Sequence, residues 1–206
     1  LGKWSQHVEN NSVFEAERIY QVLGASDYAT QLSVPATIGD FIQRQSAVYR
    51  DPLLGSITRY SHPRFDSAVV DISVYPFSPF TKQFVASAVQ GSTLSEPVLA
   101  VEMQNEIAQI KQSISDANID DYRISAVTNA SISVNGALLK GLRLEVLLHT
   151  QTDPQYSTQY IFQKNDKVIK VTGNLPEAMM AKLVNESLPQ IQVPDESPFM
   201  RTLRQG

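Results

Sequence analysis

The chain has 206 residues, a formal net charge of −4, a sequence pI of about 5.4 and no cysteine. The missing thiols exclude zinc ribbons, iron–sulfur clusters, cysteine nucleophiles and disulfide scaffolds. The acidic balance argues against a general nucleic-acid or anionic-membrane binder, because a basic patch supplies most of such binding. Charged residues make up only 18% of the chain, and uncharged polar residues take their place. This composition favours a periplasmic or otherwise extracytoplasmic protein, with a cytoplasmic location as the alternative.

We expect a single domain over residues 1–206, since a chain of this length can bury a core without disulfides or metals. No run approaches the roughly 18 apolar residues that span a bilayer. The first residue, Leu1, is not Met, which suggests that a leader or anchor precedes this segment in the full gene. Residues 1–11 read as a loose N-terminal segment, and residues 13–22 as either a strand or a short helix.

The rest of the first half predicts short strands separated by proline and glycine turns. The extended segments span residues 29–34, 38–49, 55–61 and 68–75. In the third of these, alternation places Ile57 and Arg59 on one side and Thr58 and Tyr60 on the other.

A long helix is predicted over residues 95–117. Its apolar residues recur at spacings of three and four, which is typical of one helix face. Ser95 is the expected N-cap, and Pro97 falls in the first turn, where its missing N–H does no harm. The residues of the apolar face are Met103, Ile107, Ile110, Ile114 and Ala117.

Two hairpins follow this helix. Residues 122–134 and 138–149 flank Asn135-Gly136, which is the strongest short hairpin signal. Residues 156–164 and 168–172 flank a second tight turn at Asn165-Asp166. These arms predict four consecutive antiparallel strands.

The last predicted helix covers residues 176–188. Asn174 is its candidate N-cap, and Glu177 lies three residues later, as in a capping box. Residues 190–206 are expected to form an irregular C-terminal tail. Its apolar residues suggest docking on the same domain or a tail-mediated oligomer. They are Phe199, Met200 and Leu203.

Strands follow strands in this order, and do not alternate with helices. The sequence therefore predicts the α+β class, with a mostly antiparallel sheet flanked by the long central helix, residues 95–117, and the C-terminal helix, residues 176–188.

Motifs for catalysis and metal binding are missing from the sequence, and we expect no cofactor, no metal and no catalytic residue. The three histidines, His7, His62 and His149, do not lie at metal-ligand spacing. Neither the G-x-S-x-G elbow nor a glycine-rich phosphate loop occurs. Asp116, Asn118 and Asp120 match the start of a calcium loop, but the required Gly and bidentate Glu do not follow.

One candidate binding groove can be drawn from the first half. Aromatic residues gather there near arginines, and pairing of the neighbouring strands would let four side chains line a groove. Ordinary core and sheet packing explains the same aromatics. The candidate groove residues are Arg59, Tyr60, His62 and Tyr75.

The C-terminal part resembles Mog1/PsbP-like domains, in which a hairpin with a polar turn precedes a helix that packs across an antiparallel sheet. The resemblance lies in the hairpin at residues 160–171 and in Asn174-Leu175-Pro176-Glu177-Ala178. Residues 35–41, 54–60 and 71–76 also resemble a group of uncharacterised bacterial proteins. The likeness covers residues 13–190 and rests on hydrophobic patterns. It implies a fold and a non-enzymatic binding or accessory role, and it carries over no catalytic residue.

Three hypotheses remain open for the function. The first is a non-enzymatic binding or assembly domain of a bacterial envelope, with an unknown protein or small-molecule partner. The second is an enzyme with an unrecognised carboxylate site that uses Asp71, Glu102 or Glu145. The third is a self-associating structural subunit.

Overall fold

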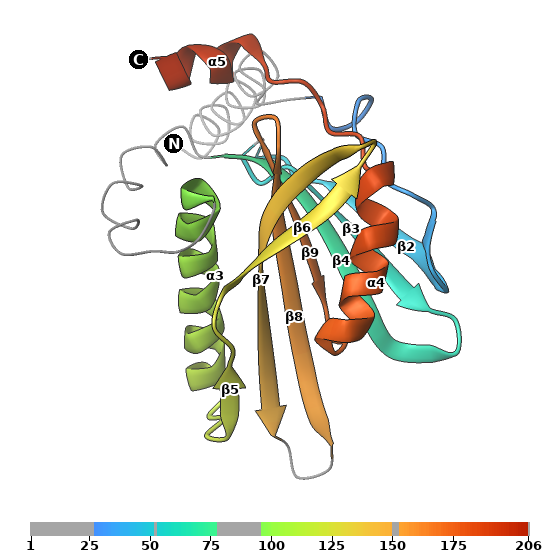
Figure 1. Cartoon of the computed structure of the whole chain (residues 1–206), viewed down its shortest axis with the longest axis vertical. Helices are drawn as coiled ribbons and strands as arrows, with labels where there is room; N and C mark the ends of the chain where they lie inside the picture. The colour runs from blue at the N-terminus through green and yellow to red at the C-terminus, as the bar shows by residue number, and fades with distance from the viewer. Residues whose placement is uncertain (1–26, 52, 78–95, 150–152, 206) are drawn as a thin grey trace, which may run out of the picture.

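A computed structural model of the chain describes residues 27–51, 53–77, 96–149 and 153–205 (Figure 1). The predictions for the N-terminal segment, for residues 13–22 and for a Ser95 cap lie outside these residues.

The first half contributes four strands. They are β1 (Thr37–Ile38), β2 (Phe41–Val48), β3 (Ser56–His62) and β4 (Phe65–Pro76). Gly39, at φ +54°, forms the tight turn between β1 and β2, where a side chain would be strained. The strand expected over residues 29–34 is reduced to one antiparallel bridge, between Ser33 and Gln192.

The second half contributes five strands where four were predicted. They are β5 (Tyr122–Ile124), β6 (Thr128–Val134), β7 (Ala137–His149), β8 (Pro154–Lys164) and β9 (Lys167–Gly173). The predicted arm 122–134 is divided between β5 and β6, and both pair with the same edge of β7. Ser125 marks the division, because its N–H donates to the Glu145 carbonyl and its hydroxyl accepts the Glu145 N–H.

Both predicted tight turns are confirmed. Asn135 and Gly136 adopt positive φ angles of 51° and 82°, as a two-residue hairpin turn of this type requires. Asn165 adopts a φ of 56° in the turn between β8 and β9. Asparagine tolerates this left-handed conformation better than most residues, so the turn chemistry fixes the register of both hairpins.

All pairings in the described sheet are antiparallel, in the order β1-β2-β3-β4-β9-β8-β7-β5, with β6 also on β7. Helices α3 (Pro97–Asp116) and α4 (Glu177–Ser187) lie against its two faces (Figure 1). The predicted α+β class is confirmed. We call the two sides of the sheet the α3 face and the α4 face.

Each face carries its own hydrophobic core. On the α4 face, Phe162 and Tyr60 pack with Met180 of α4. On the α3 face, Ile161 and Leu142 pack with Met103 of α3. The central strands of the sheet are therefore covered on both sides.

Helix α3 confirms the predicted apolar face except at Ala117, which follows the helix as its C-cap residue and is exposed. Met103 and Ile114 are buried, and Ile107 and Ile110 pack partly against the same core. The residue at the N-cap position is Glu96, and its side chain makes no capping hydrogen bond.

Helix α4 is capped by the sheet and not by Asn174. Its N-cap position is Pro176, and the N–H of Glu177 donates to Oε2 of Glu145 on β7 over 2.9 Å. Asn174 instead holds β4, accepting the N–H of Val69 over 2.8 Å. The predicted capping box is therefore wrong, since a carboxylate distant in sequence takes the capping role.

The C-terminal segment is more ordered than predicted. After α4 come η1 (Leu188–Gln190), the bridge to Ser33, and helix α5 (Pro198–Gln205). The tail docks on its own chain, because Met200 is fully buried there. Phe199 and Leu203 also lie on α5.

Among the described residues, no helix is both long and apolar enough to cross a membrane.

Candidate binding site

The structure does not bring the four predicted groove residues together. Tyr60 belongs to the core of the α4 face, and its hydroxyl donates to the Pro35 carbonyl over 2.7 Å. Tyr75 packs against the core of the α3 face. Strand alternation places Arg59 on the side opposite to Tyr60. The predicted groove is therefore divided between the two faces of the sheet.

His62 is part of an aromatic cluster at the β3–β4 turn. Its ring lies 5.4 Å from that of Phe41 and 4.8 Å from that of Phe65, centroid to centroid. Its Nδ1 accepts the N–H of Arg64 over 3.1 Å. The side chain is buried and closes the turn, which is a structural role.

Arg59 and Tyr75 are each held by a carboxylate on the α3 face. Arg59 forms a two-pronged ion pair with Asp71, with both N–O distances at 2.8 Å. The Tyr75 hydroxyl donates to Glu102 of α3 over 2.6 Å. Burial, together with the charges of Glu102 and Glu106, raises the pKa of Tyr75, so its phenol stays protonated.

The carboxylates named for an enzymatic site do not converge. Asp71 and Glu102 lie on the α3 face, bonded to Arg59 and Tyr75, whereas Glu145 caps α4 on the other face. No group of three or more His, Cys, Asp or Glu residues in the described segments could hold a metal ion.

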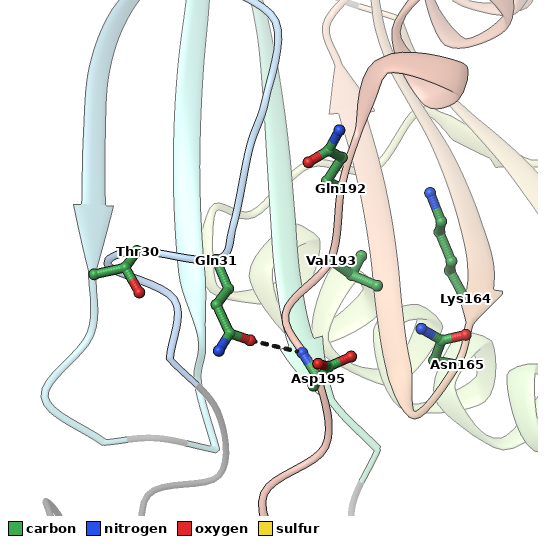
Figure 2. A pocket seen from close by; sticks show the side chains of 7 residues that line it. All are labelled: Thr30, Gln31, Lys164, Asn165, Gln192, Val193 and Asp195. Carbon is green, nitrogen blue, oxygen red and sulfur yellow. Dashed lines mark hydrogen bonds between the residues drawn. The ribbon is translucent and has the colours of Figure 1, made fainter.

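An open pocket of about 470 Å³ lies at the end of the sheet that carries the β8–β9 turn. Three segments far apart in the sequence meet there: the stretch before β1, the β8–β9 turn and the tail after η1 (Figure 2). We call it the tail pocket. Its lining residues are Thr30, Gln31, Lys164, Asn165, Gln192, Val193 and Asp195.

The walls of the tail pocket are held by backbone bonds. Ser33 and Gln192 exchange both backbone hydrogen bonds, at 3.0 and 2.9 Å. The Gln31 Oε1 accepts the N–H of Asp195 over 3.0 Å, as Figure 2 shows. These contacts join the tail to the segment before β1, so the pocket has a defined shape although its walls are irregular.

Thr30 is fixed by the turn that precedes it. Its N–H and hydroxyl both donate to the carboxylate of Asp27. These bonds lower the pKa of Asp27 and keep it ionised.

Lys164 is the cation of the tail pocket. Its Nζ donates to the Ile191 carbonyl over 2.6 Å, and its half-buried side chain lines the pocket (Figure 2). The turn that carries Lys164 is rigid, because Asp166 pairs with the fully buried Lys167 and its carbonyl accepts the Phe77 N–H. Lys164 and Asn165 are thus presented from a fixed support.

Sequence reasoning identified the β8–β9 turn but missed the pocket. The tail was expected to be irregular, and no local pattern announces that Gln192 pairs with Ser33. The only available signal was the polar Lys164-Asn165 at a hairpin tip, which is equally typical of an exposed turn.

No family model matches the chain, and no curated protein matches it. The structure is similar to the solution structure of cyanobacterial PsbP (CyanoP) from Synechocystis sp. PCC 6803, with a TM-score of 0.42 and 12% sequence identity. That match covers 82% of this chain and 93% of the other.

Proposed function

We propose that this chain is a non-enzymatic binding or accessory domain that holds a polar ligand, or a segment of a partner protein, in the tail pocket. The observation that carries the proposal is the pocket's construction from three separate segments around Lys164. Ligand sites are concave and orient their ligand through placed polar groups, and the lining of the tail pocket is polar except for Val193. The dispersal of Asp71, Glu102 and Glu145 over two faces favours binding over catalysis.

We further propose that the protein is bacterial and works outside the cytoplasm. The low share of charged residues supports this location. An antibody raised against the folded chain, applied to periplasmic and cytoplasmic fractions of the source cells, tests it. Recovery in the cytoplasmic fraction alone would overturn it.

The binding proposal can be tested by amide NMR with defined probes. Free amino acids, N-acetylated dipeptides with free or amidated ends, and mono- and disaccharides are added in turn at millimolar concentration. We expect at least one probe to shift the backbone amides of Gln31, Asn165 and Gln192. Shifts spread evenly over the chain, or none from any probe, would contradict the proposal.

A matched pair of variants controls this experiment. Gln192 is exposed at the tail pocket, so Gln192→Trp fills the opening without disturbing a core. Gln155 is equally exposed on β8 but lies nine residues from Lys164, about 30 Å along the strand. Gln192→Trp should abolish the shifts, and Gln155→Trp should leave them unchanged. Shifts that persist in Gln192→Trp would mean that the site lies elsewhere.

A further inference from the structure

The three lysines of the β8–β9 hairpin differ in whether a carboxylate pairs with their ammonium group. Lys167 is paired with Asp166, and Lys170 with Glu106 of α3. Lys164 has no ion pair with a carboxylate among the described residues, and its Nζ bonds only the neutral Ile191 carbonyl. An ammonium group has three N–H donors, so Lys164 keeps donors and an unneutralised charge at the pocket.

The neighbouring groups add further N–H donors. The Oε1 atom of Gln31 is occupied by the N–H of Asp195, which leaves its NH₂ group as a donor. Asn165 and Gln192 contribute two more primary amides to the lining. The lining therefore holds one cation and three amide N–H donor groups, and donors of these kinds bind anions through hydrogen bonds that the cation strengthens.

The charge of the lining limits which anion fits. Lys164 supplies one positive charge, which matches an anion that carries a single negative charge. The amide side chains match the N–H and C=O groups of a peptide link. The volume of about 470 Å³ falls in the range of sites for small ligands.

We propose that the tail pocket binds a single carboxylate group carried on a short amide chain, with Lys164 as its cationic partner. This inference rests on the proposed binding function and names its ligand class. The carboxylate could be the free C-terminus of a polypeptide or a small free acid. Because the pocket is open, binding weakens as salt screens the charge.

The test compares N-acetyl-Ala-Ala, its C-terminal amide and acetate by amide NMR titration of the full chain. A hydrogen bond to a charged group supports an expected dissociation constant at least about tenfold lower for the acid than for the amide. Raising NaCl from about 50 to about 500 mM should reduce the difference in dissociation constant between the acid and the amide, because salt screens the attraction between the carboxylate and Lys164. A peptide acid that binds tighter than acetate identifies a polypeptide end, and equal affinity identifies a small acid.

The variant Lys164→Gln removes the charge and keeps a polar side chain with an N–H donor, while the tail stays joined to the segment before β1 by the two Ser33–Gln192 backbone bonds. We expect it to erase the preference for the acid. Lys182→Gln, on the exposed side of α4, is the matched control and should retain the preference. Circular dichroism and thermal melts of both variants confirm that the fold is intact.

Each outcome bears on the inference. Equal affinity for acid and amide in the native chain would overturn the carboxylate assignment and leave the binding function standing. An acid preference that survives in Lys164→Gln would overturn the role of Lys164. Failure of all three probes, while other probes still shift the pocket amides, would again remove only the carboxylate assignment.

Discussion

The two faces of the sheet are held to their helices in opposite ways. On the α4 face the sheet sends a carboxylate to the helix, since Glu145 accepts the first N–H of α4. On the α3 face the helix sends carboxylates to the sheet, where Glu102 meets Tyr75 and Glu106 meets Lys170. On the α4 face, the carboxylate satisfies a backbone N–H at the start of the helix. On the α3 face, charged groups are partly buried between the helix and the sheet, where removing one partner of an ion pair lowers the stability of the fold.

The largest expected effect concerns the ion pair under α3. Lys170→Met leaves Glu106, whose side chain is 11% exposed, without its cation. Breaking a pair of this kind costs about 3 kcal/mol of unfolding free energy. Urea denaturation followed by circular dichroism measures the loss.

The double variant Lys170→Met with Glu106→Met is the control. Because both charges are gone, its stability should return to within about 1 kcal/mol of the native chain. A double variant as unstable as the single one would show that packing, not the stranded charge, sets the cost.

The second effect is alkaline destabilisation through the phenols of the α4 face. Burial raises the pKa of Tyr60 and Tyr160 to about 12, whereas a tyrosine in the unfolded chain titrates near about 10. Above pH 10 the unfolded chain loses these protons first, so folding stability falls progressively from pH 10 through pH 12. Melting temperatures taken across this range should decline.

Tyr160→Phe separates this effect from general alkaline damage. It removes one of several buried phenols with a raised pKa, Tyr75 on the α3 face among them, and should flatten part of the decline above pH 10. An unchanged slope would assign the pH dependence to other groups.

The third effect tests the cap of α4. Glu145→Ala leaves the Glu177 N–H without its carboxylate partner, and loss of a cap costs about 1 kcal/mol. Hydrogen exchange at Glu177 and the next amides should quicken, while amides of α3 stay protected. Glu145→Gln, which keeps an acceptor oxygen, should recover part of the loss. Equal exchange in both helices would contradict a local capping role.

The smallest expected change in stability concerns two polar side chains on the α3 face of the sheet. Gln159 and Thr172 are direct partners across β8 and β9, and Gln159 Oε1 and Thr172 Oγ1 are buried without a hydrogen-bond partner. Thr172→Val should therefore leave stability unchanged or raise it by up to about 1 kcal/mol, since no bond is lost. Destabilisation by more than about 1 kcal/mol would mean that Thr172 is bonded.

The sequence predicted features whose causes are local. Asn135-Gly136 carries its own turn geometry, and the apolar spacing of α3 is a property of one helix. The cap of α4 was misassigned because Glu145 reaches it only after β7 and α4 have packed. The four predicted groove residues do not line one groove, because Arg59 and Tyr60 are neighbours on one strand and their side chains point to opposite faces of the sheet. Aromatic residues that are close in sequence can therefore still lie on different faces.

The tail pocket could not be read from the sequence for a related reason. Its segments are joined by the Ser33–Gln192 bridge and the Lys164–Ile191 bond, and neither leaves a periodic pattern. Polar residues at hairpin tips and tails are common, so their meeting is visible only in three dimensions.

The pairing of β4 with β9 has a consequence for how the chain is assembled. Strand β4 obtains one of its two neighbours only when residues about a hundred positions later in the chain are in place, since Asp71 pairs with Thr172. During synthesis from the N-terminus onwards, the β4 edge of the β3–β4 hairpin therefore stays unpaired until β9 has been made. Non-local pairing of this kind slows folding, and an open edge is where strands of other chains can add. The protein would depend on rapid completion of its last hairpin, or on a chaperone that shields β4 until then.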